Sequence, residues 1–127
     1  MVKILIMDDE AGMRNILVSM LKFAGHSLLQ AEDGKQAIAI AMREKPDLAL
    51  LDMRVPDMDG LEVLSELKTT TPSLPCIMLS GFGDAETAAE AIKRGAFDYI
   101  SKPFKVNEVL EIINKALTAK SKPSESG

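Results

Sequence analysis

The chain has 127 residues, of which 46% are hydrophobic, 27% are charged and only 4% are aromatic, and its formal net charge is −4. This length and composition indicate one compact domain with a single core. No apolar run approaches the roughly 20 residues that a membrane-spanning helix requires, and the amino terminus lacks the segments of a signal peptide. The acidic balance argues against direct binding to nucleic acid. We therefore expect a cytoplasmic protein that binds neither membranes nor DNA.

Strand-like and helix-like segments alternate along the chain. Short apolar runs predict strands, in chain order, over residues 2–7, 27–31, 47–51, 76–79 and 97–101. Apolar residues at helical spacing predict the helices that follow them, over residues 13–24, 37–42, 61–67, 84–94 and 106–117. This repeated pattern is typical of an α/β fold with a doubly wound parallel sheet. The third run is apolar almost throughout, which predicts a strand buried on both faces.

Local signals mark several helix ends. Gly25 and Gly95 are expected to end helices, because glycine readily adopts the backbone conformation found after a helix. Asp59 and Glu62 have the spacing of a capping pair at a helix start, and Asp84 is expected to cap the helix that follows it. These signals agree with the alternation of elements and leave no long structureless segment between them.

Polar side chains stand where four of the predicted strands end. Asp8 and Asp9 follow the first strand, Asp52 the third, Ser80 the fourth and Lys102 the fifth. The carboxyl ends of parallel strands meet at one edge of an open α/β sheet, where ligands bind. We therefore expect three acids, a hydroxyl and an ammonium to share one pocket.

The chemistry of this group suits a metal and a phosphate. Three converging acids repel one another unless a cation offsets them, and Mg²⁺ prefers hard oxygen ligands and often bridges carboxylates to a phosphate. Lys102 would place a fixed positive charge near a phosphoryl oxygen, and the Ser80 hydroxyl could donate a hydrogen bond to one. Singly, these residues have ordinary interpretations: Asp8 and Asp9 as helix caps, Lys102 as a solvated side chain and Ser80 as a turn residue. Together they favour a metal-and-phosphate site.

These residues resemble the signature of the response regulator receiver family, over residues 2 to about 117. The motifs that carry the resemblance are Asp8-Asp9, Asp52 with Pro56 and Met58-Asp59-Gly60, Ser80-Gly81, and Tyr99 with Lys102-Pro103-Phe104. The resemblance implies a flavodoxin-like fold with five helices and a five-stranded parallel sheet in the order 2-1-3-4-5. It also implies that Asp52 accepts a phosphoryl group from a histidine kinase or a phosphotransfer protein. The domain would then be a phosphoacceptor in a two-component phosphorelay, not an enzyme with a separate substrate.

The same resemblance implies a role for each residue around the phosphorylation site. Asp9, Asp52 and the backbone carbonyl of Arg54 would bind Mg²⁺ directly, while Asp8 would act mainly through a metal-bound water. Lys102 would pair with the phosphoryl group. A cis peptide bond to the proline that follows it would aim its side chain inward.

Phosphorylation is expected to act as a switch. Ser80 would bond the phosphoryl group and draw its loop inward, and Tyr99 would move into the vacated space. Residues 84–117, which hold the fourth helix, the fifth strand and the fifth helix, would then present a changed face to an output domain, a downstream protein or a second copy of the chain. Arg54 and Phe82 would border the path of the hydrolytic water and tune a slow self-dephosphorylation.

Residues 83–99 most resemble receivers attached to sigma-54-dependent transcription activators. We expect a receiver domain over residues 1–118 and a polar tail or the start of a linker over residues 119–127. A transcriptional output would come from sequence beyond Gly127 or from a separate partner. A stand-alone phosphorelay carrier with a similar receiver is the alternative.

Two other site chemistries fit less well. An aspartyl phosphatase of the haloacid dehalogenase type needs a second aspartate two residues after its nucleophile, where this chain has Arg54. A flavodoxin needs hydroxyls and glycines after its first strand to bind phosphate, where this chain has Asp8-Asp9-Glu10. Cys76, the only cysteine, lies in an apolar run and is expected to be a buried structural thiol.

Overall fold

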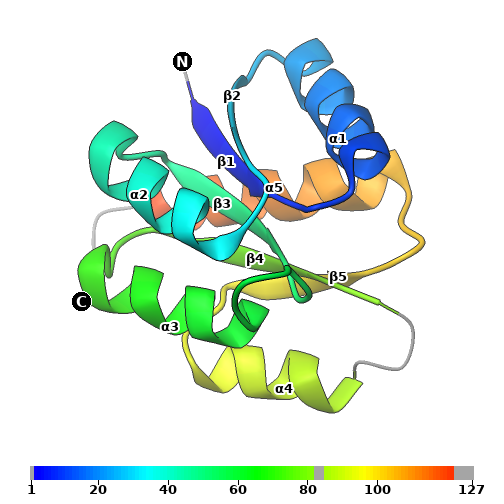
Figure 1. Cartoon of the computed structure of the whole chain (residues 1–127). Helices are drawn as coiled ribbons and strands as arrows, with labels where there is room; N and C mark the ends of the chain where they lie inside the picture. The colour runs from blue at the N-terminus through cyan, green and yellow to red at the C-terminus, as the bar shows by residue number, and fades with distance from the viewer. Residues whose placement is uncertain (1, 82–84, 122–127) are drawn as a thin grey trace.

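The computed structural model of the chain describes residues 2–81 and 85–121, which form a parallel sheet flanked by helices (Figure 1). The strands are β1 (Lys3–Met7), β2 (Ser27–Ala31), β3 (Leu48–Asp52), β4 (Cys76–Ser80) and β5 (Asp98–Ser101). The helices are α1 (Ala11–Phe23), α2 (Gly34–Glu44), α3 (Gly60–Thr70), α4 (Ala85–Lys93) and α5 (Val106–Ser121). The strand order is β2-β1-β3-β4-β5, which confirms the predicted fold. No helix within the two described ranges combines the length and the apolar character that crossing a membrane requires.

Two strands extend slightly further than the apolar runs predicted. β3 includes Asp52 and β4 includes Ser80, so each of these polar residues is the last residue of a strand. Backbone hydrogen bonds continue beyond them, from the Met53 N–H to the Leu79 carbonyl at 3.0 Å and from the Lys102 N–H to the Ser80 carbonyl at 2.8 Å. The sheet itself therefore holds these polar residues in place, because its hydrogen bonds do not stop where the apolar residues stop.

Helix α5 extends beyond the predicted stripe of apolar residues. It continues to Ser121, so residues 119–121 of the predicted polar tail are helical. Alanine and lysine, which occupy positions 119 and 120, both favour helix, and this propensity carries the helix past its last buried turn. The domain boundary at residue 118 stays a prediction. Asp84, the predicted cap of α4, and Phe82 lie outside the described residues.

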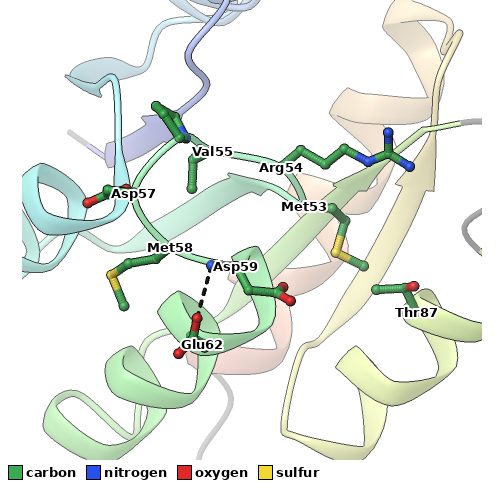
Figure 2. Close-up of a pocket in the computed structure, with 9 residues that line it drawn as sticks. Met53, Arg54, Val55, Asp57, Met58, Asp59, Glu62 and Thr87 are labelled. Atoms are coloured by element: carbon green, nitrogen blue, oxygen red, sulfur yellow. Dashed lines mark hydrogen bonds between the residues drawn. The ribbon is translucent and has the colours of Figure 1, made fainter.

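The predicted helix ends are present. The Asp59 carboxylate accepts a hydrogen bond from the Leu61 N–H at 2.9 Å. The Glu62 carboxylate accepts one from the Asp59 N–H at 3.1 Å, as Figure 2 shows. The Asp59 side chain also accepts a hydrogen bond from the Glu62 N–H, which completes the predicted capping pair at the start of α3. Gly25 and Gly95 follow α1 and α4 with φ angles of 95° and 106°, which glycine adopts without strain.

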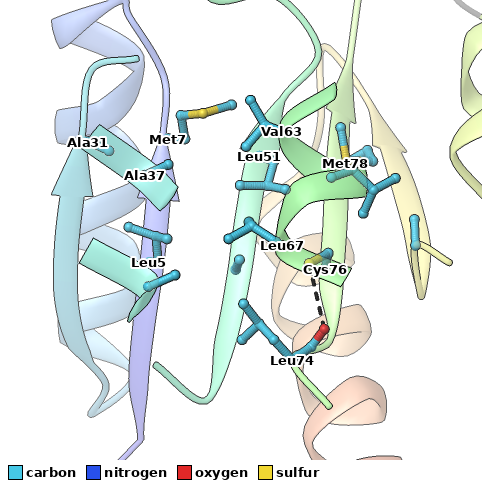
Figure 3. Packing of buried hydrophobic residues seen from close by; sticks show 14 of the residues in the cluster. Leu5, Met7, Ala31, Ala37, Leu51, Val63, Leu67, Leu74, Cys76 and Met78 are labelled. Carbon is cyan, nitrogen blue, oxygen red and sulfur yellow. Dashed lines mark hydrogen bonds between the residues drawn. The ribbon is translucent and has the colours of Figure 1, made fainter. Parts of the chain in front are cut away.

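The core lies in two layers, one on each face of the sheet. Successive residues of a strand point to opposite faces. Ile4 and Ile6 of β1 accordingly pack into a cluster with residues of α1 and α5. Leu5 and Met7 pack into the other cluster, with residues of α2, α3 and α4 (Figure 3). All of β3 is buried, which confirms the prediction of a central strand covered on both faces.

Cys76 belongs to the cluster under α2, α3 and α4 (Figure 3). Its Sγ lies 3.6 Å from the Leu74 carbonyl oxygen. Burial raises the pKa of the Cys76 thiol to about 12, so the thiol stays protonated at physiological pH. The prediction of a buried structural thiol is confirmed.

Candidate functional site

The carboxyl ends of β1 and β3 bring Asp8, Asp9 and Asp52 together. One carboxylate oxygen from each of the three lies within 4.8 Å of the others. Strand pairing explains this arrangement, because Met7 pairs with Leu51 in the neighbouring strand, so Asp8 and Asp52, which follow them, lie side by side at the carboxyl ends of β1 and β3. Asp8 is fully buried and Asp52 nearly so, whereas Asp9 is exposed.

Lys102 reaches this acidic cluster from the end of β5. Its Nζ lies 3.4 Å from the Oδ2 of Asp52 and 3.8 Å from the Oδ2 of Asp8. The peptide bond between Lys102 and Pro103 is cis, as the family resemblance implied. One ammonium therefore neutralises part of the charge of two buried carboxylates.

The remaining carboxylate oxygens have different partners. The Oδ1 of Asp8 accepts a hydrogen bond from the Glu10 N–H at 2.9 Å, and the Oδ1 of Asp52 accepts one from the Arg54 N–H at 3.1 Å. The Oδ2 of Asp8 is buried and accepts no hydrogen bond from any described residue, although the Lys102 ammonium is near. A buried carboxylate oxygen in this position is unfavourable unless a ligand satisfies it.

The pKa of Asp52 reflects its burial and the charges around it. Burial raises the pKa of Asp52 above its usual value, and the nearby Asp8 carboxylate raises it as well. The hydrogen bond from the Arg54 N–H and the charge of Lys102 lower the pKa without cancelling the effect of burial. Three carboxylates and one ammonium thus give the site more negative charge than Lys102 offsets.

These features fit a hard divalent cation. Mg²⁺ takes oxygen ligands from one or two carboxylates and keeps several waters. A bound cation and its waters would satisfy the buried Oδ2 of Asp8 and offset the negative charge of the neighbouring carboxylates. Arg54, whose carbonyl the family resemblance assigns as a ligand, lines the same pocket, and its role in metal binding stays a prediction.

A pocket of about 420 Å³ opens over the cluster. It is lined by Asp9, Asp52, Arg54, Val55, Pro56, Gly81 and Lys102. Because one water occupies about 30 Å³ in the liquid, this volume accommodates a phosphoryl group together with several waters. The pocket presents carboxylates and an ammonium to the same space, which suits a ligand made of a cation and an anion.

Ser80 and Tyr99, the two predicted switch residues, occupy different surroundings. Ser80 is buried at the end of β4, and its hydroxyl donates to the Ile100 carbonyl at 3.5 Å, the long limit for a hydrogen bond. This hydroxyl is therefore weakly held. Tyr99 lies on β5, pairs with Met78 of β4 and is exposed, and it does not line the pocket.

A second pocket, of about 500 Å³, shares the loop residues Arg54, Val55 and Pro56 with the first (Figure 2). The side chains of Met53, after β3, and Thr87, on α4, point toward each other across it in Figure 2. Its acids are Asp59 and Glu62, which cap the start of α3, and Asp57. The loop after β3 thus separates the charged pocket from a groove that faces α4.

Sequence reasoning missed the residue that anchors this loop, Asp57. Its carboxylate accepts hydrogen bonds from the Gly34 N–H at 2.8 Å and the Lys35 N–H at 3.0 Å, at the start of α2. The bond from Gly34 is the main reason that the pKa of Asp57 lies below its usual value. In Figure 2 this side chain extends away from its own loop, and its carboxylate binds the start of α2. Nothing in the local sequence distinguishes Asp57 from an ordinary solvated acid, because its partners are distant along the chain.

Arg14 of α1 was also missed. Its Nη1 donates to the backbone carbonyl of Asp8 at 2.7 Å. The sequence offered no signal for this contact, because a charged residue beside apolar Met13 in an amphipathic helix is normally solvated. The contact places a guanidinium directly behind the acidic cluster.

The sequence of the chain is similar to those of known proteins. Residues 4–114 match the family described as response regulator receiver domain. The chain is 37% identical over 119 residues to sporulation initiation phosphotransferase F of Bacillus subtilis. This match covers 94% of the chain and 96% of that protein. It is 34% identical over 113 residues to the DNA-binding transcriptional regulator NtrC of Salmonella typhimurium, over 89% of this chain. The chain spans only 24% of that relative.

A solved structure extends the comparison to three dimensions. The crystal structure of NtrX from Brucella abortus superposes with a TM-score of 0.90 at 38% sequence identity. The similarity covers 94% of this chain and 28% of that chain. The similarity therefore extends through nearly all of this fold but reaches only about a quarter of the larger protein.

Proposed function

The chain belongs to the response regulator receiver family, and we propose that it accepts a phosphoryl group on Asp52 from a histidine kinase or a phosphotransfer protein. Receiver domains are phosphoacceptor signalling domains that bind Mg²⁺ at an acidic pocket and interact with kinases and output domains. The observation that carries the proposal is the convergence of Asp8, Asp9, Asp52 and Lys102 at one edge of the sheet.

Asp52 is the nucleophile in this proposal. One of its carboxylate oxygens forms a bond to phosphorus while the bond from phosphorus to the donor's leaving group breaks, so the product is an acyl phosphate on Asp52. The Arg54 N–H holds Oδ1, which orients the carboxylate. Lys102, 3.4 Å from Oδ2, places positive charge where the phosphoryl oxygens would arrive. When bound, Mg²⁺ would neutralise charge on the acids and on the phosphoryl oxygens.

The proposed ligands of Mg²⁺ are of two kinds, direct ligands and one that acts through a water. Asp9, Asp52 and the carbonyl of Arg54 are the direct ligands, and Asp8 acts mainly through a metal-bound water. The lining of the pocket supports this division, because Asp9, Asp52 and Arg54 all border the open space and Asp8 does not. The complete burial of Asp8 keeps it behind the other acids.

Phosphorylation of Asp52 would change the face formed by α4, β5 and α5. The weakly held Ser80 hydroxyl can exchange its bond to the Ile100 carbonyl for a bond to a phosphoryl oxygen, and Tyr99 would respond by moving inward. The face formed by α4, β5 and α5 exposes apolar residues from all three elements, Ile92, Tyr99 and Val106. Such residues suit a contact with an output domain, a downstream protein or a second copy of the chain.

The similar proteins support two candidate roles for the phosphorylated domain. The similarity to the transcriptional regulator NtrC supports control of transcription, in agreement with the resemblance of residues 83–99 to receivers of sigma-54-dependent activators. The similarity to sporulation initiation phosphotransferase F, across 96% of that protein, supports a stand-alone phosphorelay carrier as the second candidate. In either role we expect slow self-dephosphorylation, with Arg54 beside the attacking water, and the cytoplasmic location that is typical of the family.

Intact-mass spectrometry after incubation with acetyl phosphate tests the proposed function. We expect a gain of one phosphoryl group in the wild type with Mg²⁺, and no gain without Mg²⁺ or in Asp52→Asn. Asp59→Asn is the matched control, because it removes an acid from the same loop while asparagine still caps α3. Full labelling of Asp52→Asn would refute the assignment of the phosphorylation site.

A further inference from the structure

Arg14 connects three elements behind the acidic cluster. It lies on α1, its Nη1 donates to the Asp8 carbonyl at 2.7 Å, and its Nη2 lies 3.7 Å from the Oε2 of Glu32 in the loop after β2. Its side chain is only 12% exposed. The distance to the Asp8 carbonyl is typical of a charge-assisted hydrogen bond. The guanidinium therefore holds the carbonyl of the peptide group that joins Asp8 to Asp9.

The orientation of this peptide group determines where the two carboxylates point. On its amino side, Asp8 is held by β2, because its N–H donates to the Ala31 carbonyl at 3.1 Å. On its carboxyl side, the Asp8 carbonyl accepts the hydrogen bond from Arg14. Asp9 is exposed, so the direction of its side chain depends strongly on the backbone that carries it.

We propose that Arg14 is a positioning residue that preforms the Mg²⁺ site by fixing the peptide group between Asp8 and Asp9. The inference rests on the proposed function, since it takes these acids as the metal site. Arg14 touches neither the metal nor the phosphoryl group in this role. It acts through the backbone that carries Asp9, the direct ligand, and Asp8, which acts through a metal-bound water.

Geometry and charge make opposite predictions for Arg14. A guanidinium beside the acids repels a cation, so an effect of its charge alone means that removing Arg14 would strengthen Mg²⁺ binding. If Arg14 holds the peptide group, removing it would weaken Mg²⁺ binding, because partners that orient metal ligands typically contribute 10-fold to 100-fold in affinity. The sign of the change therefore separates the two effects.

Fold stability alone does not account for the placement of Arg14. Its Nε is buried and donates no hydrogen bond to any described residue, which opposes folding. Methionine would retain much of the apolar stem and remove this unpaired donor, at the loss of the bond to the Asp8 carbonyl. We expect these two changes to offset each other in Arg14→Met, so that its metal-free stability stays close to that of the wild type.

Magnesium titration of the full chain, followed by nuclear magnetic resonance, tests the inference. The amides of Glu10 and Arg54 report on the site, because they donate to the Asp8 and Asp52 carboxylates. We expect Arg14→Met to raise the Kd for Mg²⁺ about tenfold. Arg14→Lys, which retains the charge but loses the planar fork, should also bind Mg²⁺ more weakly than the wild type.

Two controls separate positioning from general effects. Arg43→Met removes the same charge near the end of α2, where Arg43 pairs with Glu44, and should leave the Kd within about twofold. Thermal unfolding in a metal chelator should show that the Tm of Arg14→Met shifts by less than about 5 °C. If Arg14→Met does not fold, Arg14→Lys carries the comparison.

A second readout is the rate of labelling by acetyl phosphate. Because Arg14 acts through metal binding, the rate of Arg14→Met should return to near that of the wild type at saturating Mg²⁺. Unchanged or stronger Mg²⁺ binding by the variants, or a rate that stays low at saturation, overturns the inference while leaving the proposed function intact. Absence of Mg²⁺ binding and labelling in the wild type overturns both.

Discussion

Asp52 combines two requirements that oppose each other in the metal-free protein, since it is buried and must also be ionised to act as a nucleophile. Its folded-state pKa is raised, mainly by burial. A carboxyl group with a raised folded-state pKa stabilises the fold at pH below its unfolded-state pKa and loses this contribution as the pH rises through the folded-state pKa. At a pH where Asp52 is ionised in the folded protein, its burial therefore reduces the free energy of unfolding.

Asp52→Asn should stabilise the metal-free protein at neutral pH. We expect a gain on the order of 1 kcal/mol in the free energy of unfolding, because the variant removes a buried charge while conserving the shape of the side chain. Denaturant unfolding in a metal chelator measures the gain. The advantage of the variant should shrink as the pH falls, because Asp52 becomes protonated in the folded wild type. A variant less stable than the wild type at neutral pH would contradict burial as the cause of the raised pKa.

Lys102→Ala should separate metal binding from switching. Removing an ammonium 3.4 Å from Asp52 strengthens the attraction of the site for a cation, so we expect Mg²⁺ to bind several-fold more tightly. The variant should nevertheless lose the change in partner affinity on phosphorylation, because nothing replaces the ammonium beside the phosphoryl group. Magnesium titration and a partner-binding assay before and after labelling measure the two effects. Weaker Mg²⁺ binding, or normal switching, would be inconsistent with this role.

At the scale of elements, the loop from β3 to α3 folds back on the strand that carries Asp52. The Gly60 N–H donates to the Met53 carbonyl at 3.0 Å. A Cβ added at Gly60 would lie 2.6 Å from the Cα and the carbonyl oxygen of Met53 and 2.7 Å from the carbonyl oxygen of Asp52. These are backbone atoms at the end of a buried strand, so they cannot move aside without displacing the site.

Gly60→Ala should therefore destabilise the protein by about 2–3 kcal/mol, in the range expected for overpacking, and slow labelling of Asp52. Gly12→Ala is the matched control, because a Cβ at this position of α1 meets no atom within 4 Å. It should stabilise the protein by about 0.5–1 kcal/mol through the helix propensity of alanine. Denaturant unfolding and the labelling rate compare the two variants. Equal effects of both substitutions would show that the close approach of Gly60 is unimportant.

At the scale of the whole molecule, the proposed phosphorylation site lies apart from the α4, β5 and α5 face that would contact a partner. The acids and Lys102 lie at the carboxyl ends of the strands. The apolar residues that α4 and α5 expose lie beside β5, a strand at the side of the sheet. Ser80 is positioned to couple the two regions, because it ends β4 and pairs with Ser101 of β5. A small shift of Ser80 toward a phosphoryl group would therefore reach the outer strand directly.

If phosphorylation promotes self-association through this face, Ile92→Asp should weaken the phosphorylated dimer by about tenfold or more, because it places a charge in an apolar contact. Met42→Asp is the control, since Met42 is a comparably exposed apolar residue on α2. Analytical ultracentrifugation of labelled protein measures the dimer dissociation constant. Equal weakening by both variants would argue against this face as the dimer contact.

The architecture and much of the candidate site followed from patterns close together in the sequence. The apolar runs located the strands, and the polar residues that follow them, such as Asp8 and Lys102, indicated which groups would meet. The capping pair Asp59 and Glu62 was predictable because both partners lie in one helical turn. Asp57 and Arg14 were not predictable, because their partners come from other elements.

The sequence by itself determined the parallel sheet and the gathering of acids at its carboxyl edge, because strand pattern and residue type are local properties. Only the tertiary structure decided that Asp8 is fully buried with one oxygen unsatisfied, that the pKa of Asp52 is raised and that Arg14 holds the backbone behind the acids. Burial and electrostatic energies depend on distances through space between atoms of several elements. Those distances exist only once the elements have packed together.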